Sequence, residues 1–216
     1  VQTAVPVLLA ISLVHFLNDT MQSVVPALYP ILTETLSLTY AQIGWISFTF
    51  NMTGSVMQPV VGLYADRRPS PYILQFGTAM SLLGLVGIAL APSFWTVLLS
   101  VVFIGLGSAV FHPEGSRVVY FAAGGRRGFA QSVYQVGGNA GQSLAPILTL
   151  LIFLPLGQIG ALWGSAFAAA AFAVLLALVP WYKARLNEYD KRIRGRKPQR
   201  GANADASPSG LAGHPR

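Results

Sequence analysis

Six long apolar stretches leave this chain few ways to fold. Each holds about 20 or more mostly apolar residues, and they lie near residues 5–32, 40–64, 71–91, 94–118, 129–154 and 159–182. A helix of about 20 apolar residues crosses the hydrocarbon layer of a bilayer, whereas a strand of a membrane barrel needs only about ten. Turns rich in proline or glycine, such as Arg67–Pro71 and Gly124–Gly128, separate the stretches. The sequence therefore predicts an all-α, polytopic membrane protein that forms a bundle of six transmembrane helices.

The charged residues are few, and their positions predict an orientation. They make up 10% of the chain, against roughly a quarter of an ordinary soluble domain. All 14 lysines and arginines lie at or beyond the ends of the second, fourth and sixth predicted spans. Because cytoplasmic loops are enriched in Lys and Arg, we expect these ends and both termini to be cytoplasmic. Four aromatic residues fall near span ends, where amphipathic rings favour the membrane interface: Trp45, Trp95, Trp181 and Tyr182.

The excess of positive charge comes from the C-terminal part of the chain. Residues 1–182 hold five Arg against four Asp or Glu, whereas residues 183–216 hold nine Lys or Arg against three. From about Gly195 the chain is rich in Gly, Pro, Ser and Ala, a composition that cannot bury enough apolar surface to become ordered. We expect a six-helix transmembrane domain over 1–186 and a basic, disordered tail or interdomain linker over 187–216. Nucleic-acid or lipid binding by this tail is a weaker alternative, and we expect no nucleic-acid partner.

Polar side chains interrupt the first predicted span. An ionisable group within a span is unfavourable by roughly 2.5–3.5 kcal/mol, so it needs a partner or a water-filled cavity. The spacing from His15 to Asn18 and Asp19 puts these side chains on one helix face. Pro26 and Pro30 permit a bend further along the span. We expect the polar face to line a substrate or proton pathway, and a structural hydrogen-bond cluster between helices is the alternative. The candidate residues on this span are His15, Asn18, Asp19 and Gln22.

A second polar group ends the fourth predicted span, in the string Phe111-His112-Pro113-Glu114-Gly115-Ser116-Arg117. Imidazoles and carboxylates take up and release protons, so His112 and Glu114 are candidates for proton exchange or substrate contact. Arg117 follows Glu114 by three residues and can pair with it, although a solvated helix end would also explain this arginine. Gln58 in the second span is a further candidate for the pathway.

Small residues recur on the fifth predicted span. Gly137, Gly141 and Ala145 are spaced by four residues and are followed by Pro146. Such a stripe lets two helices approach closely, and helix packing alone explains it. Gln135, Asn139 and Gln142 lie on a neighbouring polar face and are candidate pathway residues.

Motifs typical of enzymes are absent from the sequence. It contains no HExxH zinc motif, no GxSxG elbow and no GxxxxGK[ST] phosphate loop. The string His112-Pro113-Glu114 has the wrong spacing for two metal ligands on one helix face. The chain has no cysteine, which excludes disulfides and thiolate ligands. We therefore expect no enzymatic activity, no cofactor and no metal site.

Four strings carry a resemblance to a known family. Gly62-Leu63-Tyr64-Ala65-Asp66-Arg67-Arg68 resembles the G-x-x-x-D-R-x motif between helices two and three of major facilitator superfamily transporters. The glycine-rich fifth span, ending in Ala145-Pro146, is similar to the glycine–proline motif of that family's antiporters. Residues 13–19 (LVHFLND) and 105–114 (GLGSAVFHPE) resemble the fosmidomycin resistance protein branch. The resemblance covers about residues 5–186.

The resemblance implies a transporter of twelve helices in two six-helix halves, with the substrate path between them. It also implies drug efflux driven by proton antiport at the bacterial inner membrane, and hence antibiotic resistance. Asp66 would stabilise a helix end of the opposite half at the cytoplasmic gate, and Arg67 would join a charge network there. The residues that we assign to this gate are Gly62, Asp66, Arg67 and Arg117.

Six spans and a basic linker match the N-terminal half of such a transporter and its central loop. The expected partners are a small-molecule substrate, protons, the lipid bilayer, and a missing C-terminal half or a second copy of the chain. A truncated membrane module that does not transport and needs a partner is the alternative function.

Overall fold

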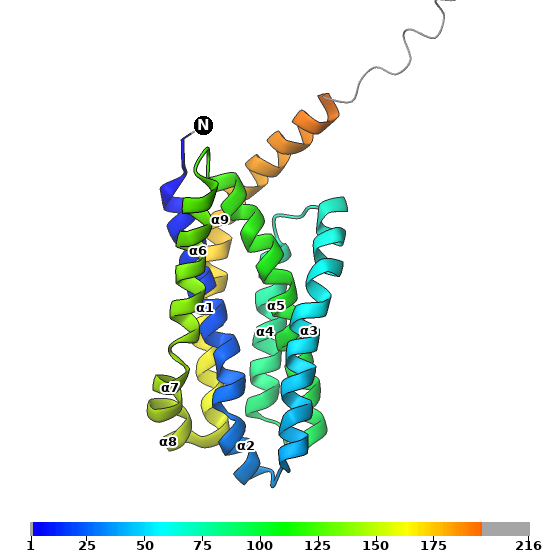
Figure 1. The fold of residues 1–216 in the computed structure, drawn as a ribbon, viewed down its shortest axis with the longest axis vertical. Coiled ribbons are helices and arrows are strands. Elements are labelled where there is room, and N and C mark those ends of the chain that lie inside the picture. The colour runs from blue at the N-terminus through cyan, green and yellow to red at the C-terminus, as the bar shows by residue number, and fades with distance from the viewer. Residues whose placement is uncertain (1, 196–216) are drawn as a thin grey trace, which may run out of the picture.

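The computed structural model describes residues 2–195, with side chains up to residue 192, and this part of the chain is helical apart from its connections. The elements are α1 (Val5–Ala27), α2 (Tyr29–Thr35), α3 (Tyr40–Arg67), α4 (Ile73–Ala89), α5 (Phe94–Ala122), α6 (Arg127–Gln142), α7 (Ala145–Leu148), the π-helix η1 (Thr149–Phe153), α8 (Leu154–Leu156), the 3-10 helix η2 (Gly157–Leu162) and α9 (Trp163–Gly195). Figure 1 shows them as an elongated bundle of rods that run roughly along one axis. The six predicted spans correspond to α1, α3, α4, α5, the run α6–α8, and η2 with α9.

The outside of the bundle is apolar, as the surface of a membrane protein must be. Large apolar side chains such as Leu83, Leu99 and Leu151 are more than half exposed. Three helical stretches are long and apolar enough to cross a membrane, namely Val5–Ala27, Phe94–Ala122 and Arg127–Arg192. Ile73–Ala89 is apolar but shorter, and α3, with 28 residues, is long enough but more polar. The fold class predicted from the sequence is thus confirmed.

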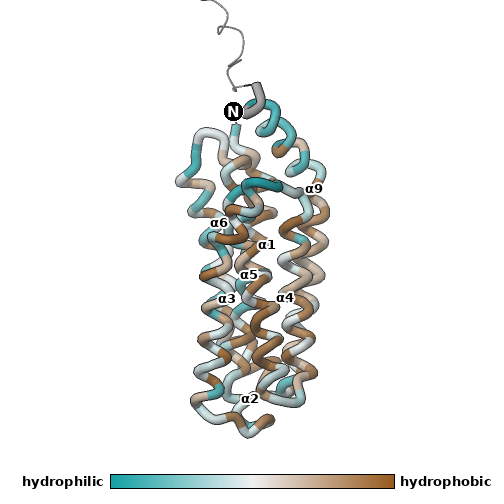
Figure 2. Tube along the Cα trace, turned by 90° about the vertical axis from the view of Figure 1, so that its right-hand side faces the viewer, coloured by the Kyte–Doolittle hydropathy of each residue, from teal (hydrophilic) through white to brown (hydrophobic). Residues whose placement is uncertain are grey.

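The basic segments lie at one end of the bundle. The chain reverses direction after each rod, so the connections that follow α3 and α5, and the end of α9, lie at the same end as the N-terminus (Figure 1). The hydroxyl of Thr3 donates to the carbonyl of Ala123 at 3.0 Å, which ties the N-terminus to the α5–α6 connection. Figure 2 shows polar residues gathered at this end and apolar residues along the rods.

Two of the predicted spans are broken by proline. The first bends at Leu28, between α1 and α2, because Pro30 has no amide hydrogen to continue the ladder of α1. The fifth was expected as one helix over 129–154. Its first helix ends at Gln142, because Pro146 cannot donate to the Gln142 carbonyl. The short elements α7, η1 and α8 complete this rod, and Gly157 turns the chain with a positive φ of 64°.

The last helix extends further than the sequence suggests. We expected a disordered tail from residue 187, but α9 continues as helix through Gly195. Leu186 is buried, and the ring of Tyr189 lies 5.6 Å from that of Phe121. Arg185 also donates to the Glu188 carboxylate at 2.7 Å. These contacts explain the added helical turns, and residues 196–216 of the predicted tail lie outside the described part of the chain.

Two apolar clusters fill the interior, one toward each end. The cluster near the N-terminal end contains Leu17 and Phe111, and the other contains Met21 and Ile104. On α1 the residues between Leu17 and Met21 are the buried polar residues Asn18, Asp19 and Thr20, and α5 carries the buried Ser108 between Ile104 and Phe111. A polar layer therefore crosses the bundle where the two apolar clusters meet.

Glycines bring α6 against α1 at the level of this layer. A Cβ atom at Gly141 would overlap the carbonyl oxygen of Phe16, and one at Gly137 would overlap that of Ser12. These two glycines are thus the positions of the predicted small-residue stripe that meet another helix backbone. The half-buried Ala145, at the start of α7, packs beside the second apolar cluster.

Gly141→Ala should lower the free energy of unfolding by about 1–3 kcal/mol, the usual effect of overpacking against a rigid neighbour. Gly44→Ala is the matched control, because Gly44 is also helical but has no atom within 4 Å of the added Cβ. The control should leave stability unchanged or raise it by up to about 1 kcal/mol. Unfolding in detergent, followed by tryptophan fluorescence, measures both variants. Equal stability of the two would contradict the close approach of α6 to α1.

Candidate functional site

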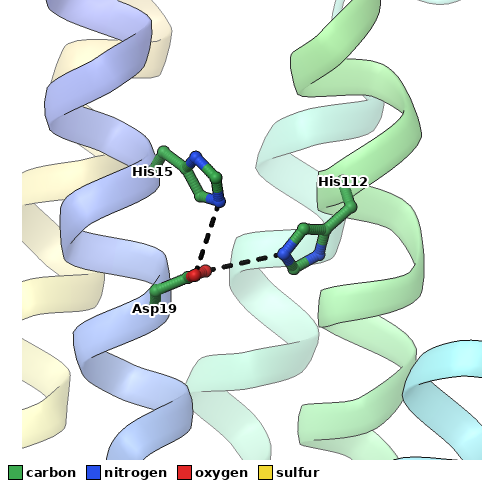
Figure 3. A group of neighbouring side chains, drawn as sticks. All are labelled: His15, Asp19 and His112. Carbon is green, nitrogen blue, oxygen red and sulfur yellow. Dashed lines mark ion pairs between the residues drawn. The ribbon is translucent and has the colours of Figure 1, made fainter. Parts of the chain in front are cut away.

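Three ionisable side chains meet in the polar layer. We call His15, Asp19 and His112 the histidine–aspartate cluster. His15 Nε2 lies 3.4 Å from Asp19 Oδ2, and His112 Nε2 lies 3.6 Å from Asp19 Oδ1. Figure 3 shows both imidazoles turned toward the carboxylate, from α1 and from α5. His15 and Asp19 are almost fully buried, whereas the His112 side chain is 29% exposed.

The other ring nitrogen of each histidine faces a backbone carbonyl. His15 Nδ1 lies 2.8 Å from the carbonyl oxygen of Tyr134, and His112 Nδ1 lies 2.9 Å from that of Ser108. A carbonyl only accepts hydrogen bonds, so each Nδ1 carries the hydrogen. The neutral form of each ring then presents a free lone pair at Nε2, toward Asp19. Gly138 makes room for the His15 ring, because a Cβ there would come 2.5 Å from the imidazole.

Side-chain amides surround the Asp19 carboxylate. Gln142 donates to Oδ2 at 2.8 Å, Asn18 donates to Oδ1 at 3.1 Å, and Gln22 approaches Oδ1 at 3.5 Å. These amide donors favour the ionised carboxylate, which only accepts hydrogen bonds. The four polar residues that we predicted on the first span are therefore in one place, together with His112 from the fourth.

A second polar group lies nearer the basic end of the bundle. Arg117 pairs with Glu114 at 2.9 Å and also with Asp66, and its Nη1 donates to the Ala65 carbonyl at 3.2 Å. The hydroxyl of Tyr182 donates to Glu114 Oε2 at 3.0 Å. Glu114 is completely buried, whereas the Asp66 side chain is 70% exposed. We call Asp66, Glu114, Arg117 and Tyr182 the carboxylate–arginine cluster.

This second cluster joins a buried carboxylate to an exposed one through a single guanidinium. Asp66 belongs to the predicted gate motif, and its cationic partner in the described chain is Arg117. Arg67 lies exposed beside it and forms no ion pair within residues 2–192. Gly62 stands one turn earlier on α3, with the Pro113 side chain in ordinary contact distance of its Cβ position.

Sequence reasoning missed the places of Tyr182 and Tyr134 in these clusters. Tyr182 was predicted at the membrane interface, because it lies near a span end, but it is buried with its hydroxyl on Glu114. Tyr134 was not predicted and contributes from α6 to the histidine–aspartate cluster, whereas Gln142, a predicted pathway residue, donates to Asp19 in the same cluster. The polar face of α6 was visible in the sequence, but the helix that it faces was not.

Other predicted pathway residues stay outside both clusters. Gln58 is half-buried on α3, and Gln135 and Asn139 are exposed on α6. In the part of the chain that the structure describes, no side-chain hydrogen bond joins them to either cluster. Pro146 is exposed at the start of α7.

The helices form a bundle with a polar layer across its middle and an ion-pair cluster at its basic end. This architecture resembles one half of a membrane transporter. The sequence matches the family model of the Major Facilitator Superfamily over residues 11–213. The chain therefore belongs to that superfamily.

Curated relatives support the branch that the sequence motifs indicated. The chain is 57% identical over 184 residues to the uncharacterized MFS-type transporter YfnC of Bacillus subtilis (strain 168). It is 48% identical over 184 residues to the fosmidomycin resistance protein of Escherichia coli (strain K12). Each match covers 85% of this chain and 45% of the relative. The chain thus spans about half the length of these relatives.

The fold is also that of a solved transporter. A bacterial homologue of the human lysosomal transporter Spinster, crystallised in an inward-facing and unoccupied conformation, matches with a TM-score of 0.68. The match covers 81% of this chain and 42% of that protein, at 22% sequence identity. At this identity the likeness shows the fold alone.

Proposed function

We propose that the chain is the N-terminal half of a secondary active transporter that exports a small polar or amphiphilic compound in exchange for protons. The observation that supports this most is the burial of two carboxylates, Asp19 at 2% and Glu114 at 0% exposure, inside an apolar bundle. Burying an ionisable group in such surroundings is energetically unfavourable, and in membrane proteins these groups mark substrate and proton paths.

The two clusters have different roles in this proposal. The histidine–aspartate cluster, with Asn18 and Gln22 beside it, supplies donors and acceptors for a polar substrate. It lies in the layer between the two apolar clusters, and superfamily substrates bind near the middle of the membrane. The partly exposed His112 is the side chain of this cluster through which a substrate has access.

Glu114 is the carboxylate that we assign to proton exchange. The charged and titratable groups around it are Arg117 on its own helix, Asp66 on α3 and Tyr182 on α9. When Glu114 is ionised, Arg117 is shared between two carboxylates. When Glu114 takes up a proton, Arg117 is left to Asp66 alone, so protonation inside the bundle alters the ion pair at its end. This link would couple the proton to the gate.

Orientation follows from the charges at the ends of the rods. We propose that the end carrying the basic connections and both termini faces the cytoplasm, in the inner membrane of a bacterium. Asp66 and Arg67 then lie at the cytoplasmic gate. Because the chain spans about half of its relatives, we further propose that a C-terminal half or a second copy completes the path.

One relative suggests a probe compound. Since the Escherichia coli relative is named for fosmidomycin resistance, we propose a drug-like compound of this kind as the exported substrate. Full-length protein in liposomes whose interior is more acidic than the bath should accumulate radiolabelled fosmidomycin as protons leave. An ionophore that collapses the pH gradient should abolish the accumulation. Uptake that ignores the gradient would count against proton antiport.

The short match to the relatives also favours one alternative, a membrane module that does not transport alone and assembles with a partner. Native mass spectrometry of the chain in detergent decides between these states. The liposome assay is then applied to the same chain. A monomer that does not transport supports a module that needs a partner, whereas a dimer that transports supports self-assembly of two copies.

A further inference from the structure

We propose that His15, Asp19 and His112 form a binding site for a divalent transition-metal ion such as Zn²⁺ or Co²⁺. One ligand atom from each residue lies within 4.8 Å of the other two. Two imidazole nitrogens and a carboxylate oxygen are a ligand set that zinc and neighbouring metals accept. The site is the histidine–aspartate cluster to which the proposed function assigns substrate binding, but the proposal concerns metal binding only and does not depend on transport.

The distances between the ligand atoms fit an ion better than they fit hydrogen bonds. The nitrogen–oxygen separations are 3.4 Å for His15 and 3.6 Å for His112. Hydrogen bonds of this type are about 2.7–3.2 Å long. Neighbouring ligands of a tetrahedral zinc ion, at about 2.0–2.1 Å from the metal, are about 3.3–3.5 Å apart. The two separations run to different oxygens of the Asp19 carboxylate, and each is close to the distance between two ligands of one ion.

The orientation of the rings is the one that metal-binding histidines adopt. A histidine that ligates a metal through Nε2 commonly donates its Nδ1 hydrogen to a carbonyl, which fixes the tautomer and the ring plane. His15 and His112 both do so, to the carbonyls of Tyr134 and Ser108. The Tyr134 ring stacks on the His15 ring with centroids 3.9 Å apart and holds it further.

The site also contains a buried ring nitrogen that makes no hydrogen bond. His15 is 98% buried, and its Nε2 makes no well-formed hydrogen bond among the described residues, although it lies 3.4 Å from Asp19 Oδ2. Buried polar atoms are nearly always paired, so one aimed at a carboxylate and a second imidazole indicates a missing partner. Figure 3 shows this nitrogen directed into the space between Asp19 and His112. A cation there would pair with all three groups at once.

His112 gives an ion access to the site. The side chain of His112 is 29% exposed, whereas those of His15 and Asp19 are 3% and 2% exposed. An ion can therefore enter from the side of His112. Three protein ligands leave coordination positions free for water or another small ligand, as in zinc sites that are not purely structural.

The sequence predicted no metal site, because that expectation considered only ligands close together on one helix. Here His15 and Asp19 share a face of α1, and the third ligand comes from α5. Only the packing of the two helices brings the set together.

The experiment measures binding of Co²⁺ to the purified full-length protein, free of any polyhistidine tag, in detergent. Its variants are His112→Gln, which removes a ligand, and His214→Gln, which makes the same change at the third histidine of the chain. Wild type and His214→Gln should bind one more Co²⁺ per chain than His112→Gln, or bind it at least about tenfold more tightly. Loss of a mere supporting residue around a metal already costs about 10–100-fold in affinity.

Circular dichroism establishes that the variants are folded, and X-ray absorption on the loaded wild type identifies the ligands without any substitution. Two imidazole nitrogens and an oxygen at about 2.0–2.2 Å are expected. The proposal is overturned if the wild type binds no Co²⁺, if all three proteins bind alike, or if the absorption spectrum shows no histidine ligands. Co²⁺ binding by a protein that does not transport fosmidomycin supports the metal site and counts against the proposed function. Transport by a protein that binds no Co²⁺ does the reverse.

Discussion

Replacing Arg117 by glutamine is expected to lower the free energy of unfolding by about 3–5 kcal/mol, because it leaves a buried carboxylate without its cation. Glu114 has no exposed surface, and Arg117 Nη1 lies 2.9 Å from it. Tyr182 alone would remain as a donor to Glu114, at 3.0 Å. Unfolding in detergent, followed by tryptophan fluorescence or by helicity, measures the loss.

Two further variants determine whether the unpaired charge is the cause. Arg117→Gln combined with Glu114→Gln should recover most of the lost stability, since two neutral amides can hydrogen-bond in place of the ion pair. Arg67→Gln is the matched control, because it removes an exposed arginine next to the same motif and should change stability by no more than about 0.5 kcal/mol. If the double variant is no more stable than Arg117→Gln alone, the buried ion pair is not what stabilises this end of the bundle.

Features fixed by local spacing were predictable from the sequence. The lengths of the apolar stretches predict the six rods, because the thickness of the bilayer sets the length of a span. Helix periodicity puts His15, Asn18 and Asp19 on one face, and it allows the pairing of Glu114 with Arg117 three residues later. The structure has both arrangements.

Contacts between rods were not predictable, because spacing within one helix says nothing about its neighbour. Gln142 reaches Asp19 from α6, and Tyr182 reaches Glu114 from α9. A tyrosine near the end of a span is equally suited to the interface and to a buried hydrogen bond, and only packing decides. The carboxylates were visible in the sequence, whereas their partners depend on the tertiary structure.

Replacing both buried carboxylates by amides, Asp19→Asn with Glu114→Gln, is expected to reduce proton-driven transport by the full-length protein at least about tenfold, equivalent to about 1.4 kcal/mol. Asn and Gln keep the volume of the side chains and still accept hydrogen bonds, so the donors Gln142 and Tyr182 keep an acceptor oxygen. Neither amide takes up or releases a proton. The variant should therefore fold but fail to couple substrate movement to the pH gradient.

The control for this prediction is Glu34→Gln, the same exchange of carboxylate for amide at an exposed position of α2 outside both clusters. It should transport fosmidomycin at the parental rate in liposomes with an acidified interior. Single variants then apportion the loss. A defect confined to Glu114→Gln would assign proton exchange to the carboxylate–arginine cluster, and one confined to Asp19→Asn would assign it to the histidine–aspartate cluster. Parental transport by the double variant would show that neither carboxylate carries the coupled proton.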